Sequence, residues 1–223
     1  YIPLPDLGLG TYTRDGHTEP GGLYPEGWTT RPPEFEATVL RIAKEQIRPL
    51  DAQGNPDPAR GKIVMMSAGM SNTVIYFEGH AGDDYACFRE RAQSDPARNP
   101  QLLVVNGAQG TRAAMDWEPV DSTTYATMKK NLAKAGATPA QVQVAWVLHA
   151  LRETGPFPTY AQEFQRYLEA TARNLKVHFP NVKLAYYSSR ERAYLMYRKG
   201  EPDCYEAGFA VRWMIDKQMK GDP

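Results

Sequence analysis

Residues 62–73 read Lys-Ile-Val-Met-Met-Ser-Ala-Gly-Met-Ser-Asn-Thr, an apolar run that ends in a turn of small and polar residues. A short apolar run bounded by a glycine turn is typical of a strand that is buried on both faces of a parallel sheet. We therefore predict a strand over Lys62–Ala68. The turn after it carries the hydroxyl of Ser71 to the end of the sheet, where a helix follows.

The same pattern recurs downstream, where apolar runs alternate with helical stretches in the order βαβαβαβα. Parallel crossovers are right-handed and need a covering helix, so this order predicts an α/β fold: an open, doubly wound (flavodoxin-like) parallel sheet with helices on both faces. Ligands bind such sheets beyond the carboxyl ends of the strands. The expected strands are Lys62–Ala68, Leu102–Asn106, Gln141–Leu148 and Lys183–Ser188, and the expected helices are Gly79–Gln93, Ser122–Ala135, Tyr160–Val177 and Tyr205–Lys220.

The first sixty residues have a different composition. Residues 1–32 are rich in Gly, Pro, Tyr and Thr without a sustained hydrophobic period, which indicates an extended arm. The stretch Glu34–Ile47 has the apolar spacing of an amphipathic helix. We expect residues 1–60 to form this arm and helix, packed on an α/β domain of residues 61–223.

The charge and hydropathy of the chain exclude several classes of partner. Lys+Arg and Asp+Glu both number 26, so no global field attracts nucleic acid. No apolar run approaches the roughly 20 residues that cross a bilayer, so we expect no membrane insertion. The chain begins without Met, which suggests processing and export, and we expect a secreted or periplasmic protein.

Two cysteines, Cys87 and Cys204, are too few for a disulfide scaffold and lack the spacing of a zinc site. We predict a Cys87–Cys204 bridge, because the helix after the first strand and the loop before the last helix can be neighbours in this architecture. Two separate thiols are the alternative. The glycine turns lack the spacing of a phosphate-binding loop or a dinucleotide fingerprint, so no cofactor and no metal are expected.

The first two strand ends carry the candidate chemistry. Ser71 is the candidate nucleophile, and its alternative role is to cap the next helix. After the second strand, the glycines of Asn106-Gly107-Ala108-Gln109-Gly110 let a backbone N–H approach a ligand, as an oxyanion hole requires. Trp117 in the same loop is either the wall of a sugar or acyl pocket or a buried core residue.

These residues carry a resemblance. Gly69-Met70-Ser71-Asn72 resembles the first block of the SGNH (GDSL-like) hydrolases, especially the Gly-Gln-Ser-Asn form of carbohydrate and sialate acetylesterase-type members. Gln109-Gly110-Thr111 followed by Trp117 is similar to the second block. The closing stretch Tyr205–Trp213 is similar to that of a poorly characterised bacterial group related to these esterases. The resemblance implies that Ser71 attacks an ester carbonyl while the N–H groups of Ser71 and Gly110 hold the oxyanion.

The sequence departs from the family at two places. The third block, where the family has an Asn, reads Trp146-Val147-Leu148-His149-Ala150, and the C-terminal Asp-x-x-His is absent. His149 follows the third strand and is the candidate replacement base, although an ordinary hydrogen-bonded histidine is the alternative. Glu206 occupies the region of the missing acid and base, and it orients a base, serves as one or caps the last helix.

The other residues near strand ends have weaker assignments. Arg190 follows the fourth strand and can bind a carboxylate, a sulfate or a sugar hydroxyl, or else pair with Asp203 or Glu206. Together with Asn72 and Trp117 it completes the candidate substrate contacts. Of the remaining histidines, His80 is expected near the first helix, and His178 at the far end of the sheet. His17 lies in the arm, whose path the sequence does not define.

Two classes of function fit these observations. The first is a serine esterase whose substrate is a carbohydrate ester or another small ester. The second is a catalytically degenerate relative that binds a glycan or a protein partner, or a structural subunit whose arm packs on a neighbouring copy, which leaves self-association open. The distance from Ser71 to the nearest histidine or carboxylate distinguishes them, because a serine without a base is weakly nucleophilic.

Overall fold

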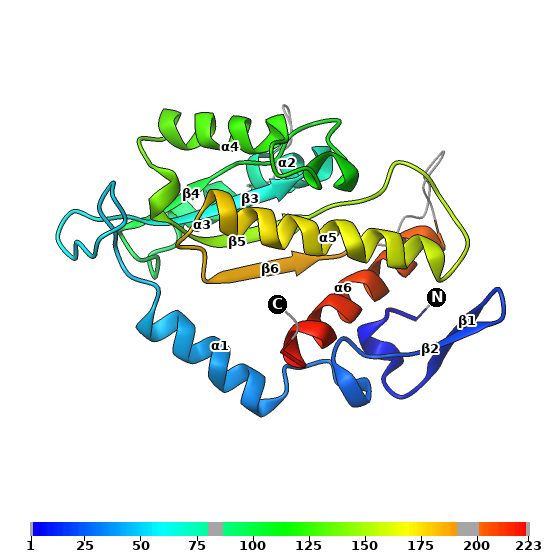
Figure 1. The fold of residues 1–223 in the computed structure, drawn as a ribbon. Coiled ribbons are helices and arrows are strands. Elements are labelled where there is room, and N and C mark those ends of the chain that lie inside the picture. Colours follow the sequence, from blue (N-terminus) through cyan, green and yellow to red (C-terminus); the bar gives the residue numbers. More distant parts are fainter. Residues whose placement is uncertain (1, 80–86, 191–200, 222–223) are drawn as a thin grey trace.

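The computed structural model describes residues 2–79, 87–190 and 201–221, and its centre is a four-stranded parallel sheet (Figure 1). The strands lie in the order β4-β3-β5-β6, and each is within one residue of its predicted bounds. This confirms the doubly wound α/β fold. The strands are β3 (Ile63–Gly69), β4 (Leu102–Val105), β5 (Val142–Leu148) and β6 (Leu184–Ser188).

The strand order reverses between β3 and β5. The chain leaves β3 for β4 on one side and leaves β5 for β6 on the other, so right-handed crossovers put their helices on opposite faces. Figure 1 shows α2 behind the sheet and α5 in front of it. The crossover helices are α2 (Ser71–Glu78), α3 (Phe88–Ser94), α4 (Thr123–Lys134) and α5 (Thr159–His178).

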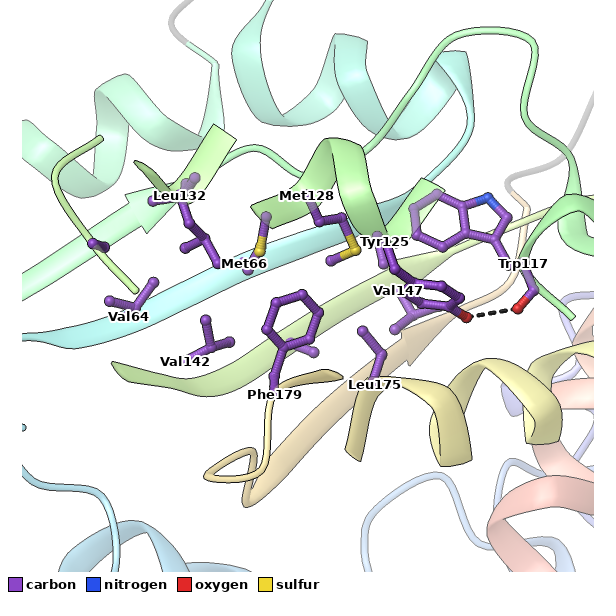
Figure 2. Close-up of a cluster of buried hydrophobic side chains, with 14 residues drawn as sticks. Val64, Met66, Trp117, Tyr125, Met128, Leu132, Val142, Val147, Leu175 and Phe179 are labelled. Carbon is purple, nitrogen blue, oxygen red and sulfur yellow. Dashed lines mark hydrogen bonds between the residues drawn. The ribbon is translucent and has the colours of Figure 1, made fainter. Parts of the chain in front are cut away.

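The main core lies between the sheet and the helices α4 and α5 (Figure 2). Strand residues such as Met66 and Val147 pack there against Met128 and Phe179. Tyr125 donates its hydroxyl to the backbone oxygen of Trp117 at 2.6 Å, which satisfies a polar group inside this core. On the opposite face Phe77 of α2 stacks on Trp146 of β5.

The N-terminal arm contains a hairpin of β1 (Thr11–Arg14) and β2 (His17–Pro20). Its turn is Asp15-Gly16, and both residues have positive φ, 53° and 80°. The hairpin packs on α6 (Asp203–Met219), where the rings of Tyr12 and Phe209 lie 5.5 Å apart. Two short helices, η1 (Pro5–Leu7) and η2 (Pro25–Gly27), flank it, and α1 (Pro33–Glu45) follows with no buried residue.

Two expectations need correction. The helix α2 (Ser71–Glu78) was not predicted; of the helix expected over Gly79–Gln93, the part from Phe88 is confirmed as α3, Gly79 lies outside any helix, and residues 80–86 lie outside the described residues. Cys87 and Cys204 are buried but form no disulfide. Cys87 precedes α3 on the face of the sheet that α2 covers, whereas Cys204 lies in α6, which packs on α5 at the other face. No helix among the described residues is long and apolar enough to cross a membrane.

Candidate functional site

Ser71 is the first residue of α2, directly after the turn that ends β3. Met70 is the N-cap, so the alternative role of Ser71 as a helix cap is wrong. The Ser71 side chain is half-buried, and no hydrogen bond to its hydroxyl exists within the described residues. The first turn of a helix has unpaired N–H groups and a partial positive charge, which favours negative charge next to Ser71.

The turn before Ser71 is packed tightly against the end of β5. A Cβ on Gly69 would lie 2.2 Å from the backbone oxygen of Leu148, so only glycine fits. Thr73 donates its hydroxyl to the same oxygen at 2.6 Å. The strand order reverses between β3 and β5, and direct contact between the Gly69 turn and Leu148 closes the space between the ends of these two strands.

The loop after β4 joins the Ser71 turn. Gln109 donates its backbone N–H to the oxygen of Gly69 at 2.9 Å. Gly110, the next residue, is exposed, and a Cβ there would meet nothing within 4 Å. Ser71 and Gly110 thus lie at the same edge of the sheet, at the ends of two neighbouring strands.

His149 follows β5 as expected, but its side chain is fully buried. Its ring lies 5.0 Å from that of Trp117, and neither ring nitrogen has a hydrogen-bond partner among the described residues. Burial lowers its pKa to about 3, so the ring is neutral at physiological pH. Ala145 and Val147 belong to the main core, and the two-residue period of a strand puts His149 on that face, away from α2. His149 is therefore not placed to deprotonate Ser71.

Trp117 is also fully buried, so it does not form an open wall for a ligand. It ends a short helix, η3 (Ala114–Trp117), which packs on α5 and contacts the residues that follow β5. Ala114 donates its backbone N–H to Ala150 at 3.0 Å, and Arg152 binds Asp116 at 2.5 Å. These bonds fix the position of η3 next to His149 and account for the burial of the His149 side chain.

Glu206 is fully buried in α6 and is bound by the N-terminal hairpin. It accepts the hydroxyl of Tyr12 at 2.6 Å, and Arg14 Nη1 lies 2.9 Å from both carboxylate oxygens. Burial raises the pKa of Glu206, and the bonds from Tyr12 and Arg14 offset part of that rise. The carboxylate anchors the arm and is not placed to orient a base for Ser71, and the described residues show no ion pair between it and Arg190.

The remaining candidates lie at scattered positions. Arg190 follows β6, and its charge acts on buried Tyr160 at the start of α5. Asn72 is half-buried in the first turn of α2. His178 ends α5, where its Nε2 lies 2.6 Å from the Val120 oxygen, and His17 is exposed in β2. His80 lies outside the described residues.

Sequence reasoning missed two hollows. An apolar slot of about 290 Å³ lies on the α2 face of the sheet between Trp146 and Tyr186. A cleft of about 370 Å³ lies at the amino ends of β5 and β6, opposite the Ser71 edge. The residues that line the cleft come from segments far apart in sequence, so no local sequence pattern indicates the cleft. Its lining is Gln46, Arg48, Leu50, Gly54, Pro56, Gln143, Asn181 and Lys183.

Comparison with known proteins adds little. No family model and no curated protein matches the chain. Among solved structures, the protein YxiM of Bacillus subtilis is similar at 14% identity and a TM-score of 0.44, over 74% of this chain and 44% of that one. The chain thus spans less than half the length of that protein. Similarity at this level carries no information about activity.

Proposed function

We propose that this protein is a serine esterase-like hydrolase that acts on a carbohydrate ester or another small ester through Ser71. One observation carries the proposal: the Ser71 hydroxyl, which has no hydrogen-bond partner among the described residues, lies at the first turn of α2, and the exposed Gly110 loop joins that turn through the bond from Gln109 to Gly69. The resemblance of Gly69-Met70-Ser71-Asn72 to the SGNH first block supports the same assignment.

In this proposal the Ser71 oxygen adds to the ester carbonyl, and the N–H groups at the start of α2 and at Gly110 stabilise the oxyanion. The alcohol leaves with the serine proton, and water then releases the acid from the acyl-enzyme. A positioned base contributes about 10²–10⁴ to such a rate. Because His149 and Glu206 are engaged elsewhere, we expect slow turnover that does not depend on His149.

A catalytically degenerate, glycan-binding protein is the second candidate. The observation that favours it is that both residues expected to assist Ser71 make other contacts. His149 lies under Trp117, and Glu206 is bound by Tyr12 and Arg14. In that case Ser71 is a half-buried polar contact and not a nucleophile.

A fluorophosphonate probe with mass mapping of the adduct separates the two. We expect labelling at Ser71, together with hydrolysis of p-nitrophenyl acetate that Ser71→Ala abolishes. The matched control is Ser94→Ala, which removes an exposed hydroxyl from α3. Hydrolysis that survives in Ser71→Ala would overturn the esterase proposal. The absence of both label and hydrolysis in the wild type, with retained glycan binding, would favour the second candidate.

A further inference from the structure

The cleft at the amino edge of the sheet is independent of the Ser71 site. It lies where β5 and β6 begin, whereas Ser71 follows the carboxyl end of β3. Its volume of about 370 Å³ falls within the range of roughly 300–1,000 Å³ typical of small-molecule sites.

The walls of the cleft are fixed by hydrogen bonds from buried side chains. Gln143, which is 1% exposed, accepts the backbone N–H of Arg48 at 3.0 Å and donates to its oxygen at 2.8 Å. Leu50 exchanges backbone bonds with Lys62 at 3.0 and 2.9 Å, and Gln141 donates its amide to the Leu50 oxygen at 2.8 Å. A site held in this way loses little conformational entropy when it binds a ligand.

The two charged side chains that line the cleft, Arg48 and Lys183, are both cations. The side chains of Arg48 and Lys183 are exposed, and neither forms an ion pair with any carboxylate in the described part of the chain. Burial and the charge of Lys183 both lower the pKa of nearby Lys176. The carboxylate of Asp51 is not among the lining groups; it accepts the backbone N–H groups of Asn55 and Gln53 within its own turn, and these bonds lower its pKa and keep it ionised.

The lining also offers hydrogen-bonding groups. Asn181 donates its amide to the Ala140 oxygen at 2.7 Å, which fixes the side chain and leaves its own oxygen as an acceptor. The Gln46 amide forms no hydrogen bond within the described residues. Two amides and two cations around a cleft of this size match a ligand with hydroxyls and one anionic group.

We infer that this cleft binds a sugar-sized organic anion, a sugar acid or a sugar phosphate, with Arg48 and Lys183 on its oxyanion and the amides of Gln46 and Asn181 on its hydroxyls. Both cations are exposed, so the binding weakens as salt screens them. The inference does not depend on catalysis by Ser71.

Titration calorimetry with glucuronate, glucose 6-phosphate, glucose and inorganic phosphate tests this inference at low salt. We expect binding of at least one anionic sugar, and the member that binds identifies the anionic group as carboxylate or phosphate. Arg48→Gln and Lys183→Gln should each weaken it about tenfold or more, the loss of one charge-assisted bond. Lys130→Gln, which removes an exposed cation from α4, should leave it unchanged.

Three results would overturn the inference. The first is the absence of binding by both anionic sugars, and the second is equal binding of neutral glucose. The third is inorganic phosphate that binds as tightly as the sugars, because the amides would then contribute nothing. Circular dichroism of each variant, with the amide NMR shifts of Gln143 and Lys183 in the wild type, separates lost binding from lost folding.

Discussion

The two edges of the sheet are built in different ways. Near the carboxyl edge, the Ser71 hydroxyl has no hydrogen-bond partner in the described part of the chain, whereas the side chains of His149 and Glu206 are buried away from Ser71. At the amino edge, buried amides from Gln141 and Gln143 hold a loop around an open cleft. A strand-end motif therefore locates a reactive group, whereas a binding site also needs side chains that hold its walls in place.

The largest expected effect tests the closed contact at the carboxyl edge. Gly69→Ala should lower the free energy of unfolding by about 3 kcal/mol or more, because the new Cβ would meet the Leu148 backbone oxygen at 2.2 Å and backbone cannot move aside. Urea denaturation measures the loss. Gly110→Ala is the matched control, with a change within about 0.5 kcal/mol. Equal losses in the two variants would mean that the two turns are not packed differently.

The second prediction concerns the pH dependence of stability. The pKa of His149 is about 3 in the folded chain and 6.5 in the unfolded chain, so the unfolded state binds the extra proton below pH 6.5. Stability should therefore fall as the pH falls, by about 2 kcal/mol between pH 7 and pH 5 from this residue alone. His149→Phe should remove that part of the slope, measured by urea unfolding at both pH values, whereas His17→Gln should not. An unchanged slope in His149→Phe would contradict the burial.

The third prediction tests the amino edge. Gln143→Met keeps a similar side-chain length but leaves the Arg48 N–H and oxygen without their partners, at a cost of about 1–2 kcal/mol. Hydrogen exchange at the Arg48 amide should accelerate in the same variant. Gln46→Met, at a side-chain amide that forms no hydrogen bond within the described ranges, should change neither quantity. Unchanged exchange at Arg48 would show that the loop is held by other contacts.

The smallest effect distinguishes a free hydroxyl from a capping one. Ser71→Ala should change the free energy of unfolding by less than about 0.5 kcal/mol, because Met70 is the N-cap of α2. Ser122→Ala should cost about 1 kcal/mol, since the Ser122 hydroxyl accepts the Thr124 N–H at the start of α4. A loss at Ser71 as large as at Ser122 would show that the Ser71 hydroxyl is structural.

The sheet could be predicted because its strands are short apolar runs separated by clear turns. The helix α2 could not be predicted, because its residues Thr73-Val74-Ile75 have the β-branched character of a strand and the signal for a helix start is weak. The hairpin of the arm has one local signal in the sequence, its turn. Asp15-Gly16 is a typical two-residue hairpin turn, but the polar strands that flank it have no hydrophobic alternation.

The candidate site divides in the same way. Ser71 and Gly110 follow directly from strand ends, so their common edge was predictable. The burial of His149 was partly predictable, because Ala145 and Val147 at a two-residue period mark its face as the core face. The burial of Trp117 depends on contacts between loops, and the partnership of Glu206 with Arg14 joins residues 192 positions apart. No local pattern encodes such contacts.

The packing of the N-terminal hairpin on α6 determines which residues the folded unit must include. The rings of Tyr12, Phe157 and Phe209 share one apolar cluster, with Trp213 packed against it. A fragment without the arm would expose this cluster to water, and a patch of that kind promotes aggregation. The rings supply the attraction, and the ion pair between Arg14 and Glu206 selects one docking position among those that the rings alone would tolerate. The hairpin and α6 therefore belong to one packed unit, and a protease that removed the hairpin would leave a remainder prone to aggregation.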